Sequence, residues 1–436
     1  MNVSQRISLF LILLVLTGIC VSSCKDDTIE PGQLCNDSLR PIVMAHGFMA
    51  SGDTYAKHFQ RFTSNDYCPE RLFVFDWNTL GTTDNIILLD AFIDTVLQLT
   101  GATQVDLAGH SAGGGLGYDY LANALRASKV AHYAHIGSSL QSAPAGPNGE
   151  VPTLNLWSQD DEVVSDKGDI PGATNVMLTG ADHYQVATTA ESFQAIYSFF
   201  NNGKQPETTE IKAENEIKLS GRALSFGENV PEIGATVDIY EGDPNNGNRI
   251  TPNPNATFNT SAQGHWGPFT ATTGTTYEFV VTTADTSARQ IHFYREGFRR
   301  SDKLVYLRTL PSPGSLAGIM LSSLPDDPGQ AALAVFSSSQ AVIDTRDFLE
   351  IGQTVLSTTE FASADQTTIA FFIYDDGDGQ TSGDALGFFS QLPFINGVDM
   401  YFPTDQLPSI ELEFNGRKLF AKSWPSSEGL VVPIFD

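Results

Sequence analysis

The feature that most constrains this chain is a serine set between a predicted strand and a predicted helix. The apolar run at 105–108 ends in the pentapeptide GHSAG, centred on Ser111, and apolar residues at helical spacing follow from 114 to 127. A sharp strand-to-helix turn lifts a serine hydroxyl clear of a sheet, and only small residues two positions before and after the serine avoid a clash. Gly109 and Gly113 meet this requirement. Ser111 is therefore a candidate nucleophile.

Two polar segments follow predicted strands farther along the chain. Asp160 and Asp161 come after the strand at 153–157, and His183 comes after the strand at 175–178. A serine hydroxyl needs an imidazole to take its proton and a carboxylate to orient that imidazole. His183 is the candidate base. We favour Asp161 as the acid because the usual pattern has one residue, here Glu162, and then two apolar residues, here Val163 and Val164, after the acid. Asp160 stays open as the alternative.

Backbone amides near Ser111 are candidates for stabilising a negatively charged oxygen. A His-Gly pair directly follows the apolar strand at 40–45, and in serine hydrolases such a turn directs an N–H toward the nucleophile. We expect the N–H groups of Phe48 and Ala112 to form this site; the alternative is a simple strand-ending turn. Trp77 follows the strand at 71–75 and is a candidate for substrate binding or for a buried structural role.

The first half of the chain alternates strands with helices. This pattern predicts a mostly parallel sheet with helices on both faces. No long insertion separates the fourth predicted strand from Trp157, so we expect no large lid. The predicted strands are 40–45, 71–75, 105–108, 131–137, 153–157 and 175–178, and the predicted helices are 53–62, 85–99, 114–127 and 189–200.

The second half shows short alternating strands and no helical periodicity, which predicts all-β structure. Its glycine layout resembles transthyretin-like or carboxypeptidase-regulatory β-sandwich modules. The division that we expect is a catalytic domain at 36–203, a linker at 204–212, a β-sandwich at 213–310 and a second β domain at 311–436, the last a candidate for lipid binding.

The N-terminus reads as an export signal. Residues 7–19 are nearly all apolar but too few to span a membrane. Small residues precede Cys24, which resembles a bacterial lipobox, and Lys-Asp-Asp follows it as in some lipoproteins of the outer cell surface. We expect a signal peptide at 1–23, a tether at 24–35 and lipid anchoring to the outer membrane through Cys24. The alternative is an ordinary secreted protein.

Composition limits the partners and cofactors. The net charge of −27 argues against nucleic acid and against docking on anionic membranes. In an exported protein, Cys35 and Cys68 are expected to form a disulfide bond; two buried thiols are the alternative. The chemistry outlined above requires no cofactor and no metal. The acidic segment 375–384 could ligate a structural calcium ion, although an acidic hairpin turn is favoured.

Residues 40–200 resemble the small, lid-poor α/β-hydrolase lipases of bacteria. The matching segments are VMAHGF at 43–48, VDLAGHSAGG at 105–114, SQDD at 158–161 and GADH at 180–183. The resemblance implies an esterase or triacylglycerol lipase in which Ser111, Asp161 and His183 act together. The β region resembles the lipid-binding tail of certain long-chain lipases. A short-chain, polyester or carbohydrate esterase, or a surface protein that binds lipid or glycan without catalysis, is the alternative.

Overall fold

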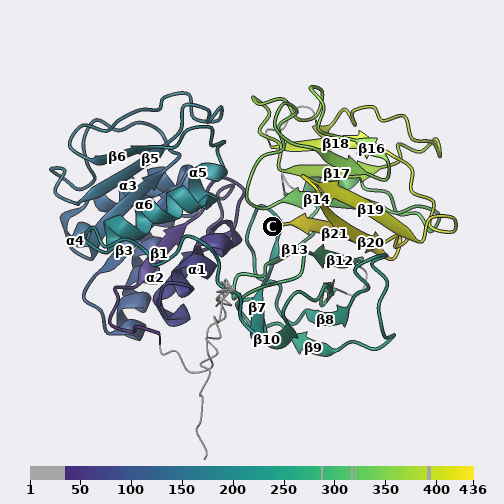
Figure 1. The fold of residues 1–436 in the computed structure, drawn as a ribbon, viewed down its shortest axis with the longest axis horizontal. Helices are drawn as coiled ribbons and strands as arrows, with labels where there is room; N and C mark the ends of the chain where they lie inside the picture. The colour runs from purple at the N-terminus through teal and green to yellow at the C-terminus, as the bar shows by residue number, and fades with distance from the viewer. Residues whose placement is uncertain (1–34, 286–287, 316–317, 320, 390–393) are drawn as a thin grey trace, which may run out of the picture.

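Two halves lie side by side in the structure, an α/β half and a β half (Figure 1). The computed structural model describes residues 35–436 apart from 286–287, 316–317, 320 and 390–393. The α/β half runs to residue 203 and the β half covers 213–436. The predicted signal peptide, the lipidation site at Cys24 and almost all of the predicted tether lie outside the described residues.

Six strands form one sheet in the α/β half, in the order β2-β1-β3-β4-β5-β6. Every pair of neighbours is parallel. The polar segments that follow the strands therefore meet at the edge of the sheet formed by the carboxyl ends. The strands are β1 (Ile42–Ala45), β2 (Leu72–Phe75), β3 (Val105–His110), β4 (Val130–Ile136), β5 (Thr153–Trp157) and β6 (Thr174–Met177).

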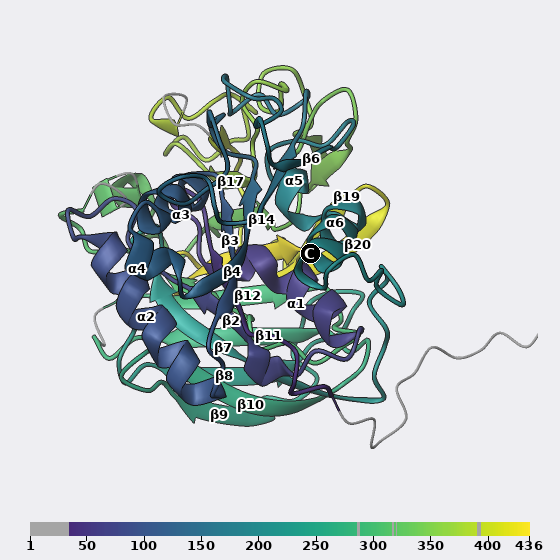
Figure 2. The same cartoon turned by 90° about the vertical axis from the view of Figure 1, so that its left-hand side faces the viewer.

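Helices cover both faces of this sheet (Figure 2). Side chains alternate along β1, so that Ile42 and Met44 pack with α1 and α6, whereas Val43 and Ala45 pack with α2 and α3. The predicted fold of this half is thus confirmed. The helices are η1 (Gly52–Tyr55), α1 (Ala56–Thr63), η2 (Pro69–Arg71), α2 (Asn85–Thr100), α3 (Ala112–Leu121), α4 (Ala124–Ala127), α5 (Gln185–Thr188) and α6 (Ala190–Phe200).

The β half is built around an eight-stranded sheet, β18-β17-β14-β21-β12-β11-β8-β9. One face packs on the three-stranded sheet β10-β7-β13 and the other on the four-stranded sheet β16-β15-β19-β20. Its elements are β7 (Glu216–Ser225), β8 (Thr236–Glu241), β9 (Ala256–Asn259), β10 (His265–Thr272), β11 (Tyr277–Thr282), β12 (Gln290–Arg295), β13 (Leu307–Thr309), η3 (Leu321–Ser323), β14 (Leu333–Ser337), β15 (Leu349–Ile351), β16 (Thr354–Val355), β17 (Ala370–Tyr374), β18 (Ile395–Asp399), β19 (Ser409–Phe414), β20 (Arg417–Lys422) and β21 (Gly429–Phe435).

The eight-stranded sheet crosses the division that the sequence suggested at residue 310. The C-terminal strand β21 pairs in parallel with β12 on one side and with β14 on the other. Strands from 213–310 and from 311–436 therefore share one sheet and one hydrophobic core. Pairing between strands this far apart in the chain leaves no local sequence signal, which is why the division appeared as two domains.

The two halves also share a hydrophobic core. Leu224, Leu304 and Tyr306 of the β half belong to the buried cluster that contains Phe59 and Phe62 of α1. The segment 204–212, predicted as a linker, contains no helix or strand but is tied to the end of α1: Thr208 N–H donates to Asn65 Oδ1 at 3.0 Å and Lys212 N–H to Ser64 Oγ at 3.0 Å.

A buried ion pair links the halves beside this shared core. Arg222 Nη1 lies 2.5 Å from Asp76 Oδ2, and the Asp76 side chain is only 2% exposed. Tyr306 Oη donates to the same oxygen at 2.7 Å, and Gly52 N–H donates to Asp76 Oδ1 at 2.7 Å. The carboxylate is therefore held by Arg222 of β7, by Tyr306, which directly precedes β13, and by Gly52 at the start of η1.

We predict that Arg222→Met lowers the free energy of unfolding by about 3 kcal/mol, because Asp76 would stay buried without its cation. Urea denaturation followed by tryptophan fluorescence measures the change. Lys418→Met is the control, since it breaks a solvent-exposed pair with Glu411 that contributes little. Equal effects of the two substitutions would contradict the structural role given to the buried pair.

Candidate active site

Ser111 occupies a strained turn between β3 and α3. Its backbone has φ 53° and ψ −120°, outside the regions that residues with a side chain usually adopt. A Cβ on Gly109 would lie 2.2 Å from Gly113 O, and a Cβ on Gly113 would lie 2.4 Å from Ala45 O. Both glycines are therefore required by contacts with backbone atoms, as the G-x-S-x-G pattern predicted. Ser111 itself is half-buried at the carboxyl end of the sheet.

His183 and Asp161 form a buried pair. His183 Nδ1 lies 2.9 Å from Asp161 Oδ2, with side-chain exposures of 4% and 2%. Because a carboxylate only accepts, Nδ1 carries a proton, and in the neutral tautomer that this fixes Nε2 is the acceptor. Burial by itself would raise the pKa of Asp161, but the hydrogen bond to His183 and two from the amides of Val163 and Val164 outweigh it and hold that pKa below its usual value.

Asp160, the alternative acid, lies elsewhere. Its side chain is exposed to solvent, and its Oδ2 accepts a hydrogen bond from Gly180 N–H at 2.9 Å. Asp160 therefore supports the loop that precedes His183, whereas Asp161 contacts the imidazole itself.

Both Ser111 and the His183–Asp161 pair lie close to the end of β4, where Gly137 follows the strand. Ser111 N–H donates to Ile136 O at 2.9 Å, and a Cβ on Gly137 would come within 3.5 Å of Asp161 Oδ2. Among the described residues no hydrogen bond joins Ser111 Oγ to the His183 ring. Catalytic hydrogen bonds of this kind are often long without substrate and shorten in the bound complex.

His110 supports the loop that carries His183. Its Nε2 lies 2.9 Å from His183 O, and the two rings are 4.7 Å apart at their centroids. Since a carbonyl oxygen only accepts, Nε2 carries the proton. Burial, with His183 beside it, lowers the pKa of His110 to about 3, so the ring is neutral. His110 and His183 are 73 positions apart, and no local sequence pattern predicts their contact.

The turn after β1 lies against Ser111. A Cβ on Gly47 would be 3.0 Å from Ser111 Cβ, so the turn that contains Gly47 and Phe48 packs directly against the residue that carries the candidate nucleophile. Ala112 is the first residue of α3, where backbone N–H groups point out of the helix. The geometry is compatible with the predicted pair of oxyanion donors, and their role stays a prediction.

Trp77 is placed on the turn rather than in an open pocket. Its indole N–H donates to His46 O at 3.1 Å, its backbone N–H donates to His46 Nε2 at 3.1 Å, and the two rings are stacked with centroids 5.8 Å apart. These contacts favour a structural role for Trp77, which was one of its two predicted roles. Contact with substrate stays a prediction.

An apolar cavity of about 90 Å³ lies between the two halves next to the site. From the α/β half it is lined by Phe48 and Met49 of the turn after β1, and by Tyr184, which follows His183. The β half contributes Phe336 and Phe394 among others, and the Phe394 ring packs edge-on against Tyr184 at 6.1 Å. The sequence could not show that these distant segments meet.

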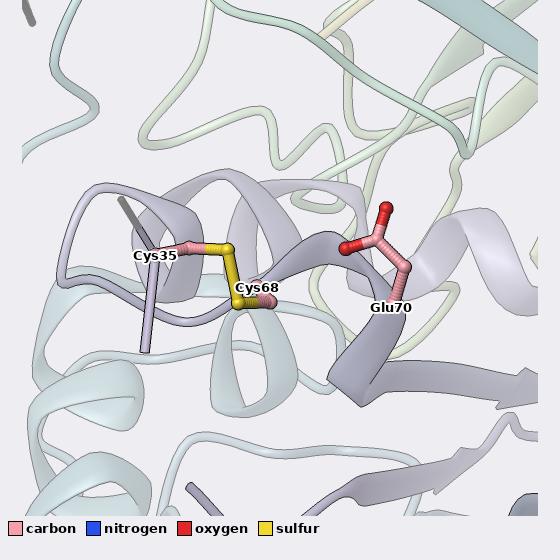
Figure 3. Close-up of side chains that lie close together, drawn as sticks. All are labelled: Cys35, Cys68 and Glu70. Carbon is pink, nitrogen blue, oxygen red and sulfur yellow. A yellow bond between two sulfur atoms is a disulfide. The ribbon is translucent and has the colours of Figure 1, made fainter. Parts of the chain in front are cut away.

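The remaining predicted sites lie away from Ser111. Cys35 and Cys68 are joined by a disulfide bond (Figure 3). Glu70 lies near them, but sulfur atoms bonded to each other are not available as thiolate metal ligands. Asp375, with Asp376 and Asp378, forms an acidic group in the segment considered for calcium.

In that acidic group, the oxygens of Asp375 accept hydrogen bonds from the N–H groups of Gly377 and Gly379, as in a hairpin turn. Calcium binding stays a prediction. Within the described residues, no helix is both long and apolar enough to cross a membrane.

Two known families match this chain. Residues 39–143 match the family Lipase (class 2), and residues 215–311 match the family Lipase C-terminal domain. The first segment contains Ser111 and the turn after β1, and the second contains β7 to β13. The predicted resemblance to lipases that carry a C-terminal β region is confirmed.

Solved structures that are similar to the chain include bacterial esterases and lipases. An esterase from Rhodococcus sp. ECU1013 has 18% identity over 39% of this chain and 94% of its own, with a TM-score of 0.32. A Bacillus licheniformis lipase in its mature form has 15% identity over 39% and 96%, with a TM-score of 0.33. The naproxen esterase of Bacillus subtilis has 14% identity over 38% and 86%, with a TM-score of 0.30.

We predict that Asp161→Asn lowers kcat for p-nitrophenyl butyrate by about 10⁴-fold, because the amide would donate to His183 and favour the wrong tautomer. Asp160→Asn should keep most of the activity, since the Asp160 side chain only accepts from Gly180 N–H. Initial rates at pH 8 compare the two variants. A larger loss in Asp160→Asn than in Asp161→Asn would contradict the pairing described above.

Proposed function

We propose that this chain, an α/β-hydrolase of the lipase type with a C-terminal lipase domain, hydrolyses carboxylic esters through an acyl-enzyme on Ser111. The observation that carries the proposal is the buried His183–Asp161 pair beside a strained serine turn. An imidazole whose Nδ1 donates to a carboxylate can accept a proton at Nε2, and this is the group that a serine hydroxyl needs as its base.

The reaction follows from the chemistry of these groups. Ser111 Oγ attacks the ester carbonyl while His183 Nε2 takes the hydroxyl proton, and Asp161 stabilises the resulting imidazolium. The carbonyl oxygen becomes negatively charged and accepts hydrogen bonds from the N–H groups of Phe48 and Ala112, each contributing roughly 3 kcal/mol to the transition state. His183 then returns the proton to the departing alcohol, and water, activated by the same imidazole, releases the acid from Ser111.

The substrates that we favour are acylglycerols. The cavity next to the site is lined largely by apolar side chains, among them Met49, Phe336 and Phe394, and its volume of about 90 Å³ suits the first carbons of an acyl chain better than a sugar. The α/β half has no helix in the segment 137–152 between β4 and β5, so no helical lid is built there. A short-chain or polyester substrate would use the same chemistry.

We predict that the wild-type protein hydrolyses p-nitrophenyl esters from butyrate to palmitate and that Ser111→Ala lowers kcat by at least about 10⁴-fold on each. Rates are measured in mixed micelles so that the long-chain esters stay dispersed. Activity rising toward palmitate supports a lipase, and activity confined to butyrate supports a short-chain esterase. Ser111→Ala with normal rates would refute the acyl-enzyme, and an inactive wild-type protein would favour a surface binding protein.

We also propose that the protein is anchored to the outer membrane by acyl chains on Cys24, a residue outside those that the structure describes. Acyl chains would hold an acidic protein at a membrane without help from surface charge. In a Gram-negative host fed radioactive palmitate, the wild-type protein should become labelled and stay in the membrane fraction. Cys24→Ser should be unlabelled. Labelling of the Cys24→Ser variant would contradict the assignment.

A further inference from the structure

A loop of the β half reaches into the turn that follows β1. This loop, residues 225–230, follows β7 and is held by its own hydrogen bonds: Asn229 N–H donates to Ser225 O at 3.0 Å, and Val230 N–H to Ser225 Oγ at 3.1 Å. Asn229 has φ 57°, a left-handed conformation that asparagine adopts more readily than most residues. Its side chain is therefore presented in a fixed direction, and the residue is 8% exposed.

The Asn229 side chain binds two turns of the α/β half at once. Nδ2 donates to Ala50 O at 2.8 Å and to Trp77 O at 3.0 Å, and Oδ1 accepts from Ser51 Oγ at 2.7 Å. Ala50 and Ser51 belong to the turn after β1, and Trp77 to the turn after β2. Every hydrogen of the amide and its oxygen have partners, as a buried polar group requires.

The ring of His46 lies between these two turns. Its Nδ1 is 2.8 Å from Gly47 O, which can only accept, so Nδ1 carries the proton. Its Nε2 is then an acceptor and receives a hydrogen bond from Trp77 N–H at 3.1 Å; Asn229 Nδ2 lies 3.3 Å away, and both of its hydrogens already have the shorter contacts to Ala50 O and Trp77 O. Burial lowers the pKa of His46 and keeps the ring in the neutral form that these partners require.

We propose that Asn229 is a positioning residue for the hydrolytic reaction. It holds the turn 46–51 in the shape that points Phe48 N–H at the oxygen of the attacked ester carbonyl. Asn229 touches no substrate and acts through Ala50 O and Trp77 O. The β half thereby completes the oxyanion site of the α/β half, a role separate from capturing lipid. This inference rests on the proposed function, since it needs a reaction at Ser111.

The turn depends on such external support. Met49 is in the left-handed region with φ 54°, a conformation that costs energy because its Cβ crowds the backbone carbonyl. Besides Asn229, four side chains make described hydrogen bonds to the backbone of the turn 46–51. Thr79 Oγ1 accepts Met49 N–H at 2.9 Å, and the His46 ring, the Trp77 indole and the Thr54 hydroxyl donate to Gly47 O, His46 O and Ser51 O. A donor displaced by about 1 Å can lower a rate by roughly 100-fold.

Two substitutions remove the hydrogen bonds that Asn229 donates: one leaves its backbone conformation unstrained, and the other keeps the shape of its side chain. Asn229→Gly removes the amide and tolerates the left-handed backbone, so it avoids the strain of an alanine. Asn229→Asp keeps the shape and the acceptor for Ser51 but loses both N–H donors, and places a carboxylate next to the carbonyls of Ala50 and Trp77. We expect both variants to lower kcat for p-nitrophenyl butyrate by roughly 10- to 100-fold with KM changed less than about 3-fold, because an oxyanion forms only after binding.

The affinity for a transition-state analogue tests the positioning role directly, because a residue that only stabilises the fold would not change that affinity. An alkyl boronic acid adds to a serine hydroxyl and places an oxygen in the oxyanion site, so its affinity for both variants should fall in parallel with kcat/KM. Rates are expressed per reactive serine after titration with a p-nitrophenyl phosphonate, which removes any effect of misfolded protein.

Gln60→Ala is the matched control. Gln60 Nε2 donates across the two halves to Asp302 Oδ2 at 3.0 Å, but the Gln60 side chain makes no described hydrogen bond to the turn 46–51. This variant should lower the melting temperature and leave kcat and boronate affinity within about 2-fold of wild type.

The outcomes distinguish the two proposals. An active wild-type protein with kcat and boronate affinity retained in Asn229→Asp would overturn the role of Asn229 and leave the acyl-enzyme standing. The role of Asn229 would also be overturned if Gln60→Ala lowered kcat as much as Asn229→Gly, because the effect would then come from weaker packing between the two halves. A wild-type protein that hydrolyses no ester and binds no boronate would overturn the proposed function itself.

Discussion

The close packing of backbone around Ser111 is the constraint on which the rest of the structure depends. The contacts at Gly109 and Gly113 leave no room for a Cβ, so β1, β3 and α3 must approach at fixed distances. A strained turn of this kind persists only where its surroundings over-determine it. The parallel sheet provides that rigidity from below, and the buried His183–Asp161 pair lies at the same edge. Fold and candidate chemistry are thus consequences of one steric arrangement.

The β half is part of the same arrangement rather than an appended module. Leu224, Leu304 and Tyr306 complete a core that α1 begins, and Asp76 is neutralised by Arg222 from β7. On the other side of the site, Asp182 Oδ2, next to His183, accepts from Ala341 N–H at 3.0 Å. Contacts from the β half therefore reach both the turn after β1 and the loop that carries His183. Each half buries surface that would be exposed in the other's absence.

Much of the α/β half could be predicted because its signals are local. The spacing of apolar residues located β1 to β6 and the long helices to within a few residues, and the order of Ser111, Asp161 and His183 selected the candidate triad. The choice between Asp160 and Asp161 needed the structure, because both residues follow the same strand and differ only in the direction of their side chains. In the β half, single strands were predicted, but their sheet was not, since β21 inserts between β12 and β14.

The amino-acid sequence by itself determined the position of the candidate nucleophile, because a serine flanked by glycines two residues away on each side, between a strand and a helix, fits a tight turn that exposes its hydroxyl. It also determined which residues could act as base and acid for that serine, since a histidine and two aspartates follow it at the ends of predicted strands. Only the tertiary structure decided what holds those residues in place. His110 on the His183 loop and Asn229 on the turn after β1 make contacts between segments far apart in the sequence. Such contacts depend on how the two halves pack, and no local pattern encodes that packing.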